Sequence, residues 1–336
     1  MDNLSDFDYR LPEELIAQTP LEDRAASRLL WLRRNGAIEH RQFRDVTAIL
    51  EAGDLLVLND TRVSALRLIG AKPTGAVVEA LLLREVSPRL FVSLMKPGKR
   101  LRQGATILFG EGLEATVVSD LEDGLKLIEF APVEDLYPIL NLYGKVPLPP
   151  YIHETLQDRE RYQTVYGSVN GSSAAPTAGL HLTSQLIEEL RGIGVEFATV
   201  TLHVGIDTFR PVQVENLDDH RMHGETCVMP EATANQIRRA KGRIIAVGTT
   251  TVRTLESFAV GRRQVMSGTQ DSRLFIRPGY EFKVIDGMFT NFHLPRTTML
   301  LMISALVGRE KILAAYKQAV EDRYRFLSFG DSMLIL

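Results

Sequence analysis

The feature that most constrains the fold is a change of pattern along the chain. Residues 66–130 contain six short runs of β-forming residues separated by Gly, Pro, Ser and Asp, namely RLIGAK, AVVEALLLREV, RLFVSLMK, ATILFG, LEATVVSD and LKLIEF. Such runs and spacings are typical of a small sandwich or barrel. After the proline-rich VPLPPYI the chain instead alternates between helical and strand patterns. That alternation is typical of an α/β domain.

The α/β pattern lies on both sides of the β-rich segment. We expect a buried strand at Asp54–Leu58 and, later in the chain, a helix from Ser184, a strand in VEFATVTLHV, a helix in ATANQIRRAKG, a strand in RIIAVG and a further helix. We therefore predict an α/β main domain, residues 1–65 and 146–336, with a small antiparallel β-barrel-like domain, residues 66–145, inserted in it. A linear series of domains would produce a similar sequence.

Composition indicates a globular protein of the cytoplasm. Hydrophobic residues make up 45% of the chain and charged residues 24%, and the net charge of -3 neither favours nor excludes a nucleic-acid partner. The single cysteine, Cys227, cannot form an intrachain disulfide. The apolar run 298–307 is shorter than the roughly 20 residues that span a bilayer, so we expect a buried helix and no membrane partner.

The stretch AAPTAGLHLT, residues 174–183, is expected to form a loop that leads into a helix N-terminus. Unpaired N–H groups at a helix start attract anions, and small residues let a ligand approach the backbone, so Thr177 and Gly179 are candidate binding residues. The alternative is a loop that only turns the chain and holds His181 in the interior.

Two expected strands deliver polar loops at their carboxyl ends, where open α/β sheets tend to bind ligands. His203 ends one strand, and RIIAVG leads into Gly248, Thr249 and Thr250, with Arg253 one turn inside the next helix. This loop lacks the lysine of a phosphate-binding P-loop. Its alternative interpretation is ordinary helix capping by threonine.

A third polar turn, TNFHLP, contains Asn291 and His293 and precedes the apolar helix at 298–307. Its alternative interpretation is an N-terminal staple with a hydrogen-bonded histidine.

A metal site is a weaker interpretation. His220 and His223 in DDHRMHGE, with Asp219 or Glu225, could ligate zinc, but zinc needs three or four ligands and the chain has neither HExxH nor paired CxxC motifs. We expect no metal. A metal-assisted hydrolase using His220 and His223, and a non-catalytic RNA-binding protein, remain as alternative functions.

Basic residues gather in several short segments. The segment RRAKGR supplies Arg238, Arg239, Lys241 and Arg243, and further clusters lie at Arg33-Arg34 and in KPGKRLR. Each cluster alone is typical of a solvated surface. Convergence of separate clusters on one side of the protein would instead favour a surface that binds RNA phosphates.

Several long motifs in order resemble one family. The start DFDYRLPEELIAQTPLEDRAASRLL and the segments NDTRV, VPLPPYI, RYQTVY, AAPTAGLHLT, TLHVGIDTFRPV, MHGE, AVGTTTVRTLES, TNFHLPRTTMLLMISA and YRFLSFGDSMLI are similar to S-adenosylmethionine:tRNA ribosyltransferase-isomerases of queuosine biosynthesis, nearly from end to end.

The resemblance implies a transferase-isomerase without a separate cofactor, with S-adenosylmethionine as co-substrate. It would transfer and isomerise the ribosyl part of S-adenosylmethionine onto 7-aminomethyl-7-deazaguanine at the wobble position of a tRNA with a GUN-type anticodon, giving epoxyqueuosine and releasing adenine and methionine. The resemblance also favours a monomer.

The reaction calls for proton transfer and anion binding. We expect His181, His203 and His293 to transfer protons. We expect the donor's carboxylate or a tRNA phosphate to be held by the helix-start N–H groups and by nearby side chains, and a base or ribose hydroxyl to be bound by Asn291. The binding set is Arg62, Thr177, Gly179, Gly248, Thr249, Thr250, Arg253 and Asn291.

Overall fold

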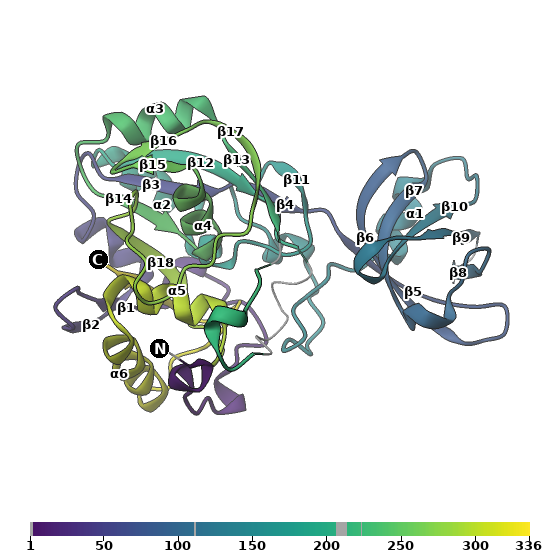
Figure 1. Cartoon of the computed structure of the whole chain (residues 1–336), viewed down its shortest axis with the longest axis horizontal. Coiled ribbons are helices and arrows are strands. Elements are labelled where there is room, and N and C mark those ends of the chain that lie inside the picture. The colour runs from purple at the N-terminus through teal and green to yellow at the C-terminus, as the bar shows by residue number, and fades with distance from the viewer. Residues whose placement is uncertain (1–2, 111, 206–213, 223) are drawn as a thin grey trace. The chain divides into compact units, whose positions relative to one another are not determined.

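A computed structural model describes residues 3–110, 112–205, 214–222 and 224–336 (Figure 1). The chain divides into two compact units. The sheet unit comprises residues up to Thr61, Pro149–Val169 and Ala175–Leu336, and the barrel unit comprises Arg62–Leu148 and Asn170–Ala174. The expected fold class, an α/β domain with an inserted small barrel, is confirmed. The predicted boundaries followed residues 65 and 145, whereas the chain changes unit after residues 61 and 148 and again after 169 and 174.

The sheet unit is built on a mixed sheet that has nine strands among the described residues. In spatial order they are β17 (Gly268–Ser272), β13 (Glu225–Met229), β12 (Glu196–Leu202), β3 (Leu55–Asn59), β14 (Ile244–Val247), β18 (Gly287–Asn291), β19 (Ser332–Ile335), β1 (Arg28–Leu32) and β2 (Ile38–Gln42).

Four neighbouring strands of this sheet, β12, β3, β14 and β18, run parallel. Every residue of β3, β14 and β18 is buried, because helices and loops cover both faces of the central strands. Their carboxyl ends share one edge, the carboxyl edge, and their amino ends share the opposite amino edge. Since β18 and β19 are antiparallel and β19 and β1 are parallel, the carboxyl end of β1 lies at the amino edge.

The helices of the sheet unit follow the predicted pattern. They are α2 (Ser184–Gly192), α3 (Glu231–Arg239), α4 (Thr249–Ser257), α5 (Thr298–Val307) and α6 (Arg309–Glu321). The apolar face of α2 joins a core formed with β3 and β14. The expected buried helix is α5, and no helix in the described part of the chain is long and apolar enough to cross a membrane.

Two short pairings complete the strand inventory. β4 (Thr61–Val63) pairs with β11 (Val169–Ser172), and β15 (Ala259–Gly261) pairs with β16 (Gln264–Val265).

The barrel unit is a closed barrel, and its strands coincide with the six predicted runs. In spatial order they are β10 (Leu125–Phe130), β7 (Leu90–Lys96), β6 (Val77–Ser87), β5 (Leu66–Ala71), β8 (Thr106–Gly110) and β9 (Leu113–Asp120). Burial alternates along β6 and β9, as expected where alternate side chains point into a barrel. A helix that was not predicted, α1 (Leu136–Tyr143), is capped by Asp135 and packs Leu136 and Leu140 into the barrel core.

The stretch AAPTAGLHLT leads into an α-helix as expected, but it is not a loop throughout, because Thr177–His181 forms a short 3-10 helix of its own. The α-helix α2 begins at Ser184, and the Thr183 hydroxyl caps it by accepting from the Leu186 N–H at 3.1 Å. The helix-start N–H groups of α2 are therefore not at Thr177.

Candidate active site

Four polar turns, which contain His181, His203, Gly248 and Asn291, come together at the carboxyl edge. Asn59, the last residue of β3, links two of them: its Nδ2 donates to the Leu202 carbonyl at 3.0 Å and to Thr250 Oγ1 at 3.2 Å. Two further contacts join side chains, His181 to Asn291 and Thr61 to His203. The turn at Gly248 faces Ala178 of the 3-10 helix, and this contact joins the two linked pairs into one cluster of four turns.

Gly248 shows why a glycine precedes α4. Its φ of 93° lies in the left-handed region that favours glycine. A Cβ on Gly248 would lie 3.6 Å from the Ala178 Cβ, so the turn before α4 faces the 3-10 helix Thr177–His181 directly. Two of the predicted binding turns are therefore neighbours.

His181 is buried and held on both ring nitrogens. The Ser27 hydroxyl donates to the Arg24 carbonyl at 3.2 Å, so it accepts from His181 Nδ1–H at 2.8 Å. His181 Nε2 then accepts from Asn291 Nδ2 at 3.3 Å, and the ring stacks on Phe43 with centroids 5.0 Å apart. Burial lowers the pKa of His181 to about 4. The ring is neutral at pH 7, in the tautomer that carries its proton on Nδ1.

His203 has a more open environment. It follows β12 and is half-buried, and its Nδ1 lies 2.7 Å from Thr61 Oγ1. Burial lowers its pKa, and the neighbouring Asp60 carboxylate opposes that shift. Among the residues that the structure describes, none hydrogen-bonds its Nε2. His203 therefore has a ring nitrogen available for a ligand.

His293 is anchored like His181. Its Nε2 lies 2.7 Å from Thr290 Oγ1, its backbone N–H donates to the Tyr316 hydroxyl at 3.0 Å, and its carbonyl accepts from the Tyr9 hydroxyl. Burial lowers the pKa of His293 to about 4. Its contacts resemble those of the predicted alternative, a hydrogen-bonded histidine ahead of α5.

The start of α4 has no side-chain cap. Gly248 occupies the N-cap position, and the Thr251 hydroxyl donates to the Val247 carbonyl one turn back. Thr249 and Thr250 form the first turn, where the partial positive charge of the helix favours an anion. The alternative interpretation, capping by threonine, is wrong, and the first turn of α4 has the features of an anion site.

Arg253 lies one turn inside α4 and is buried. Its Nη1 donates to Glu225 Oε2 at 2.6 Å and its Nη2 donates to the Ser272 carbonyl at 2.9 Å. Glu225 also accepts from the Gly205 N–H at 3.1 Å. The Arg253 charge is therefore matched by a carboxylate, and the pair connects α4 to β13 and to the loop after His203.

The other predicted binding residues have different surroundings. A Cβ on Gly179 would lie 1.8 Å from the Tyr166 hydroxyl oxygen, so the space beside Gly179 is filled by Tyr166. Thr177 begins the 3-10 helix. Arg62 belongs to the barrel unit, and its part in a site of the sheet unit stays a prediction.

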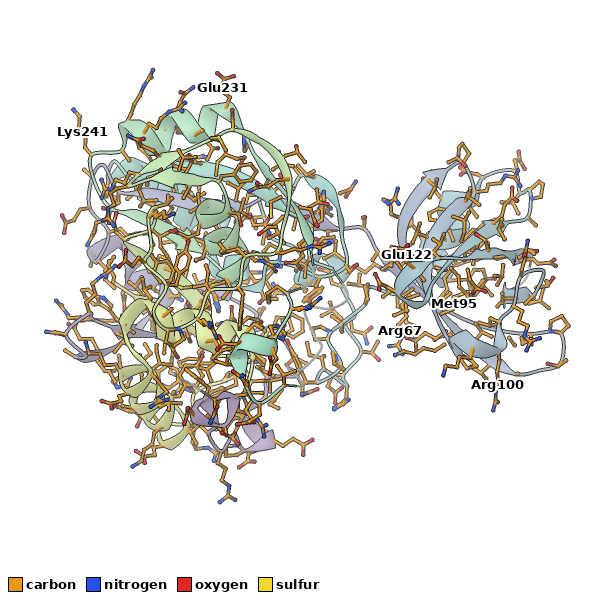
Figure 2. All side chains as sticks on the ribbon, in the orientation of Figure 1. Arg67, Met95, Arg100, Glu122, Glu231 and Lys241 are labelled. Atoms are coloured by element: carbon orange, nitrogen blue, oxygen red, sulfur yellow. The ribbon has the colours of Figure 1, made fainter. Side chains whose placement is uncertain are left out.

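The basic segment RRAKGR lies at the amino edge of the sheet, away from the histidines. Arg243 immediately precedes β14, and its guanidinium donates from Nε to Asp54 Oδ1 at 2.9 Å. Arg238 donates to the Asn235 side chain at 2.6 Å. Arg239 ends α3, and the exposed Lys241 projects from the turn after it (Figure 2). The segment therefore lies at the edge opposite the histidine cluster, and its contact with tRNA stays a prediction.

The described residues contain no group of three or more His, Cys, Asp or Glu side chains able to hold a metal ion. His220 packs against the Phe275 ring, with centroids 4.9 Å apart. His223 and residues 206–213 lie outside the described residues.

Three residues of the cluster had not been singled out from the sequence. Asn59 and Thr61 fall within the quoted motif NDTRV, and a buried strand that ends in a polar turn was the available signal. A third, Ser27, precedes β1 and had no signal, because its role depends on a contact with His181, which lies 154 positions away in the chain.

Comparisons with known proteins agree with this architecture. A family model described as "Queuosine biosynthesis protein" matches residues 4–335. A curated protein of Desulforamulus reducens named S-adenosylmethionine:tRNA ribosyltransferase-isomerase is 51% identical over 339 residues, covering 99% of each chain. A crystal structure of an S-adenosylmethionine tRNA ribosyltransferase from Thermotoga maritima is 38% identical, with a TM-score of 0.57, and the match covers 98% of this chain and all of that one. The chain therefore belongs to the queuosine biosynthesis protein family.

Proposed function

We propose that this protein is a tRNA-modifying transferase-isomerase. It transfers and isomerises the ribosyl part of S-adenosylmethionine onto 7-aminomethyl-7-deazaguanine at the tRNA wobble position, giving epoxyqueuosine, adenine and methionine. Family membership and the names of the two relatives support the reaction. The observation that carries the proposal is the meeting of four polar turns at the carboxyl edge, where sheets of this class bind ligands.

His203 is the proposed proton carrier. The sulfonium of the donor acidifies the adjacent 5′ carbon, so a positioned base begins the rearrangement, and the departing adenine then needs a proton. His203 has the contacts for this role, because Thr61 orients its Nδ1 and its Nε2 is available to a ligand. The neighbouring Asp60 carboxylate favours its protonated form.

His181 and Asn291 are proposed to orient the substrate. His181 is neutral at pH 7, since burial lowers its pKa to about 4, and its Nε2 accepts from Asn291. The other Asn291 N–H donates to the Leu327 carbonyl at 3.0 Å, which fixes the amide orientation. Asn291 Oδ1 is then a buried acceptor without a hydrogen-bond partner in the described part of the chain. That oxygen suits a ribose hydroxyl or a base N–H of the donor.

The first turn of α4, with Thr249 and Thr250, is proposed to hold the methionine carboxylate of the donor through backbone N–H groups. The proposal further includes a tRNA with a GUN-type anticodon as acceptor, no cofactor besides the co-substrate, a monomeric state and a cytoplasmic location. His293 is assigned a supporting role through its contacts with Thr290 and Tyr316.

The direct test supplies the protein with S-adenosylmethionine and a tRNA that carries 7-aminomethyl-7-deazaguanine. We expect free adenine and methionine in equal amounts and a heavier wobble nucleoside, detected by chromatography and mass spectrometry of the digested tRNA. A tRNA that carries unmodified guanine is the control and should release no adenine. Absence of both adenine and the new nucleoside with the aminomethyl substrate would refute the proposal.

A chelator arm separates this reaction from the alternative, a metal-assisted hydrolase using His220 and His223. The transferase-isomerase keeps its rate in EDTA, because acid/base groups and backbone N–H groups carry the chemistry. A metal-dependent hydrolase would lose activity and regain it when a divalent cation is added back.

A further inference from the structure

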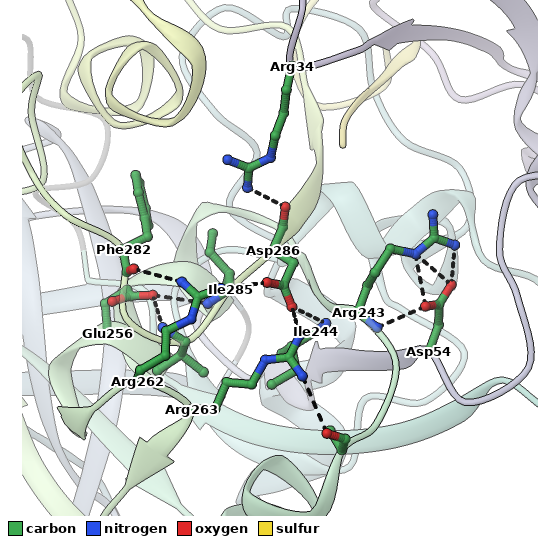
Figure 3. A network of polar contacts seen from close by, with 12 residues as sticks. Arg34, Asp54, Arg243, Ile244, Glu256, Arg262, Arg263, Phe282, Ile285 and Asp286 are labelled. Atoms are coloured by element: carbon green, nitrogen blue, oxygen red, sulfur yellow. Dashed lines mark hydrogen bonds and ion pairs between the residues drawn. The ribbon is translucent and has the colours of Figure 1, made fainter.

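A second candidate site lies at the amino edge of the sheet. A cavity of about 670 Å³ is lined by five arginines, Arg33, Arg34, Arg243, Arg262 and Arg263. The first two follow β1, Arg243 precedes β14, and the last two lie between β15 and β16. Figure 3 shows four of them converging around Asp286 and Asp54. Segments more than 200 residues apart in the chain therefore combine into one basic surface.

The charges in the cavity do not balance. Asp286 shares its carboxylate between Arg262 at 3.0 Å and Arg263 at 2.6 Å, and its Oδ2 also accepts from the Ile244 N–H at 2.9 Å. Arg34 donates to the Asp286 backbone carbonyl at 2.5 Å, and the described residues give it no carboxylate within ion-pair distance.

The other charged groups of the lining leave this excess in place. Arg243 is neutralised by Asp54 and Arg33 by Glu39. Glu281 is the remaining acidic residue of the lining. Among the side chains of the lining, three guanidiniums therefore face two carboxylates, and Arg33 shares Glu39 with Arg41, so these side chains favour an anion.

The available donors suit phosphate. Arg34 is exposed and the Arg262 side chain is 65% exposed, so both guanidinium forks can reach a ligand. Trp31 also lines the cavity, and its Nε1–H is buried without a hydrogen-bond partner among the described residues. Planar guanidiniums bind phosphate oxygens in pairs, and the aromatic residues Tyr280 and Phe282 add surface for a base or sugar.

We propose that this cavity, here called the arginine cavity, is a phosphate-binding site separate from the candidate active site. Two sources supply such phosphate: the tRNA backbone, an assignment that rests on the proposed function, or a free nucleotide. The convergence of Arg33-Arg34 with Arg243 favours the backbone, because separate basic clusters meeting on one side are expected of a surface that positions RNA.

A fluorescence titration tests the site itself. Trp31 is the only tryptophan of the chain, so its emission reports directly on the cavity. We expect a saturable change when pyrophosphate or ADP is added to the wild-type protein. The double variant Arg34→Gln with Arg262→Gln should weaken this binding at least tenfold. The control Arg191→Gln, an exposed arginine on α2 with its own partner Glu188, should leave it unchanged.

A second arm measures the affinity for the tRNA between 50 and 200 mM salt. Each phosphate contact contributes about 0.7–0.9 to the slope of log K against log salt concentration. The slope of the double variant should be shallower by the contribution of about one or two phosphate contacts, while Arg191→Gln should keep the wild-type slope. Arg243 and Arg263 are left intact because they hold Asp54 and Asp286.

The outcomes are distinct. A shallower slope identifies the tRNA backbone as the source, and loss of nucleotide binding with an unchanged slope identifies a free nucleotide. The proposal is overturned if two results are found together: the Trp31 emission of the wild-type protein does not change with pyrophosphate or ADP, and the double variant keeps the wild-type slope for tRNA. Both arms measure binding, so they fail or succeed independently of adenine release by the enzyme.

Discussion

Replacing Asn59 with alanine tests whether this side chain holds the carboxyl edge together. Asn59 is fully buried, and its amide satisfies three backbone groups: the Leu202 carbonyl at 3.0 Å, the Leu202 N–H at 3.0 Å and the Thr61 N–H at 3.2 Å. Leu202 and Thr61 are themselves buried. A buried group left without its partner costs about 1–3 kcal/mol. The lower bound for three groups gives a loss of about 3 kcal/mol for Asn59→Ala.

Urea unfolding followed by Trp31 fluorescence measures this loss, because Trp31 lies in β1 of the sheet unit and reports on that unit alone. We expect a lower midpoint with an unchanged m-value. The control Asn35→Ala removes an exposed amide with one local bond, to the Ala37 N–H, and should change stability by about 0.5 kcal/mol or less. A loss below about 1 kcal/mol for Asn59→Ala would refute this account of the strand ends.

Three further predictions concern single groups. His203→Ala should lower kcat about 100-fold with tRNA affinity unchanged, and an unaltered kcat would reject proton transfer by His203. The pKa values of His181 and His293 fall to about 4 on folding, so the unfolded chain binds more protons than the folded protein below pH 6.5. The free energy of unfolding should therefore decline as the pH falls from 6.5 to 4, and a flat profile would contradict this. Gly179→Ala should destabilise the protein by about 1–3 kcal/mol, because the added methyl group clashes with the Tyr166 hydroxyl. Adding Tyr166→Phe should restore part of that stability, and if it restores none, this clash is not the cause.

The barrel and the sheet were predictable because their strands carry their own signal. Alternating burial at the start of β9 follows from its alternating apolar residues, β6 is rich in β-branched and apolar residues, and β3 is a continuous apolar run that ends in Asn59. α1 was missed because it spans only eight residues, contains Pro138 and follows six strands, so its pattern is too short for a helical period to emerge.

The candidate site was predictable as a set of turns, and its internal geometry was not. The motifs identify His181, His203 and Asn291, yet the neutral state of His181 depends on burial against Phe43 and on a bond to Ser27. Such contacts depend on how the sheet is ordered in space. The sequence pattern contains no information on them.

The same limit applies to the basic residues. The expected contact of Arg243 with tRNA stays a prediction, whereas its ion pair with Asp54 was not predicted, because the parallel pairing of β3 and β14 sets it. Arg262 and Arg263 were not singled out, because their relation to Arg34 exists only once β18 places Asp286 between them. Ion pairs between distant segments follow from strand register.

Hydrogen exchange with and without S-adenosylmethionine tests the central claim most directly, since a bound donor slows exchange of the backbone N–H groups that it covers. We expect added protection in four peptides together, those containing residues 176–182, 201–205, 248–252 and 289–293, with no change in the barrel strands. Protection confined to one of these peptides, or found only in the barrel unit or around the arginine cavity, would contradict a single donor site at the carboxyl edge.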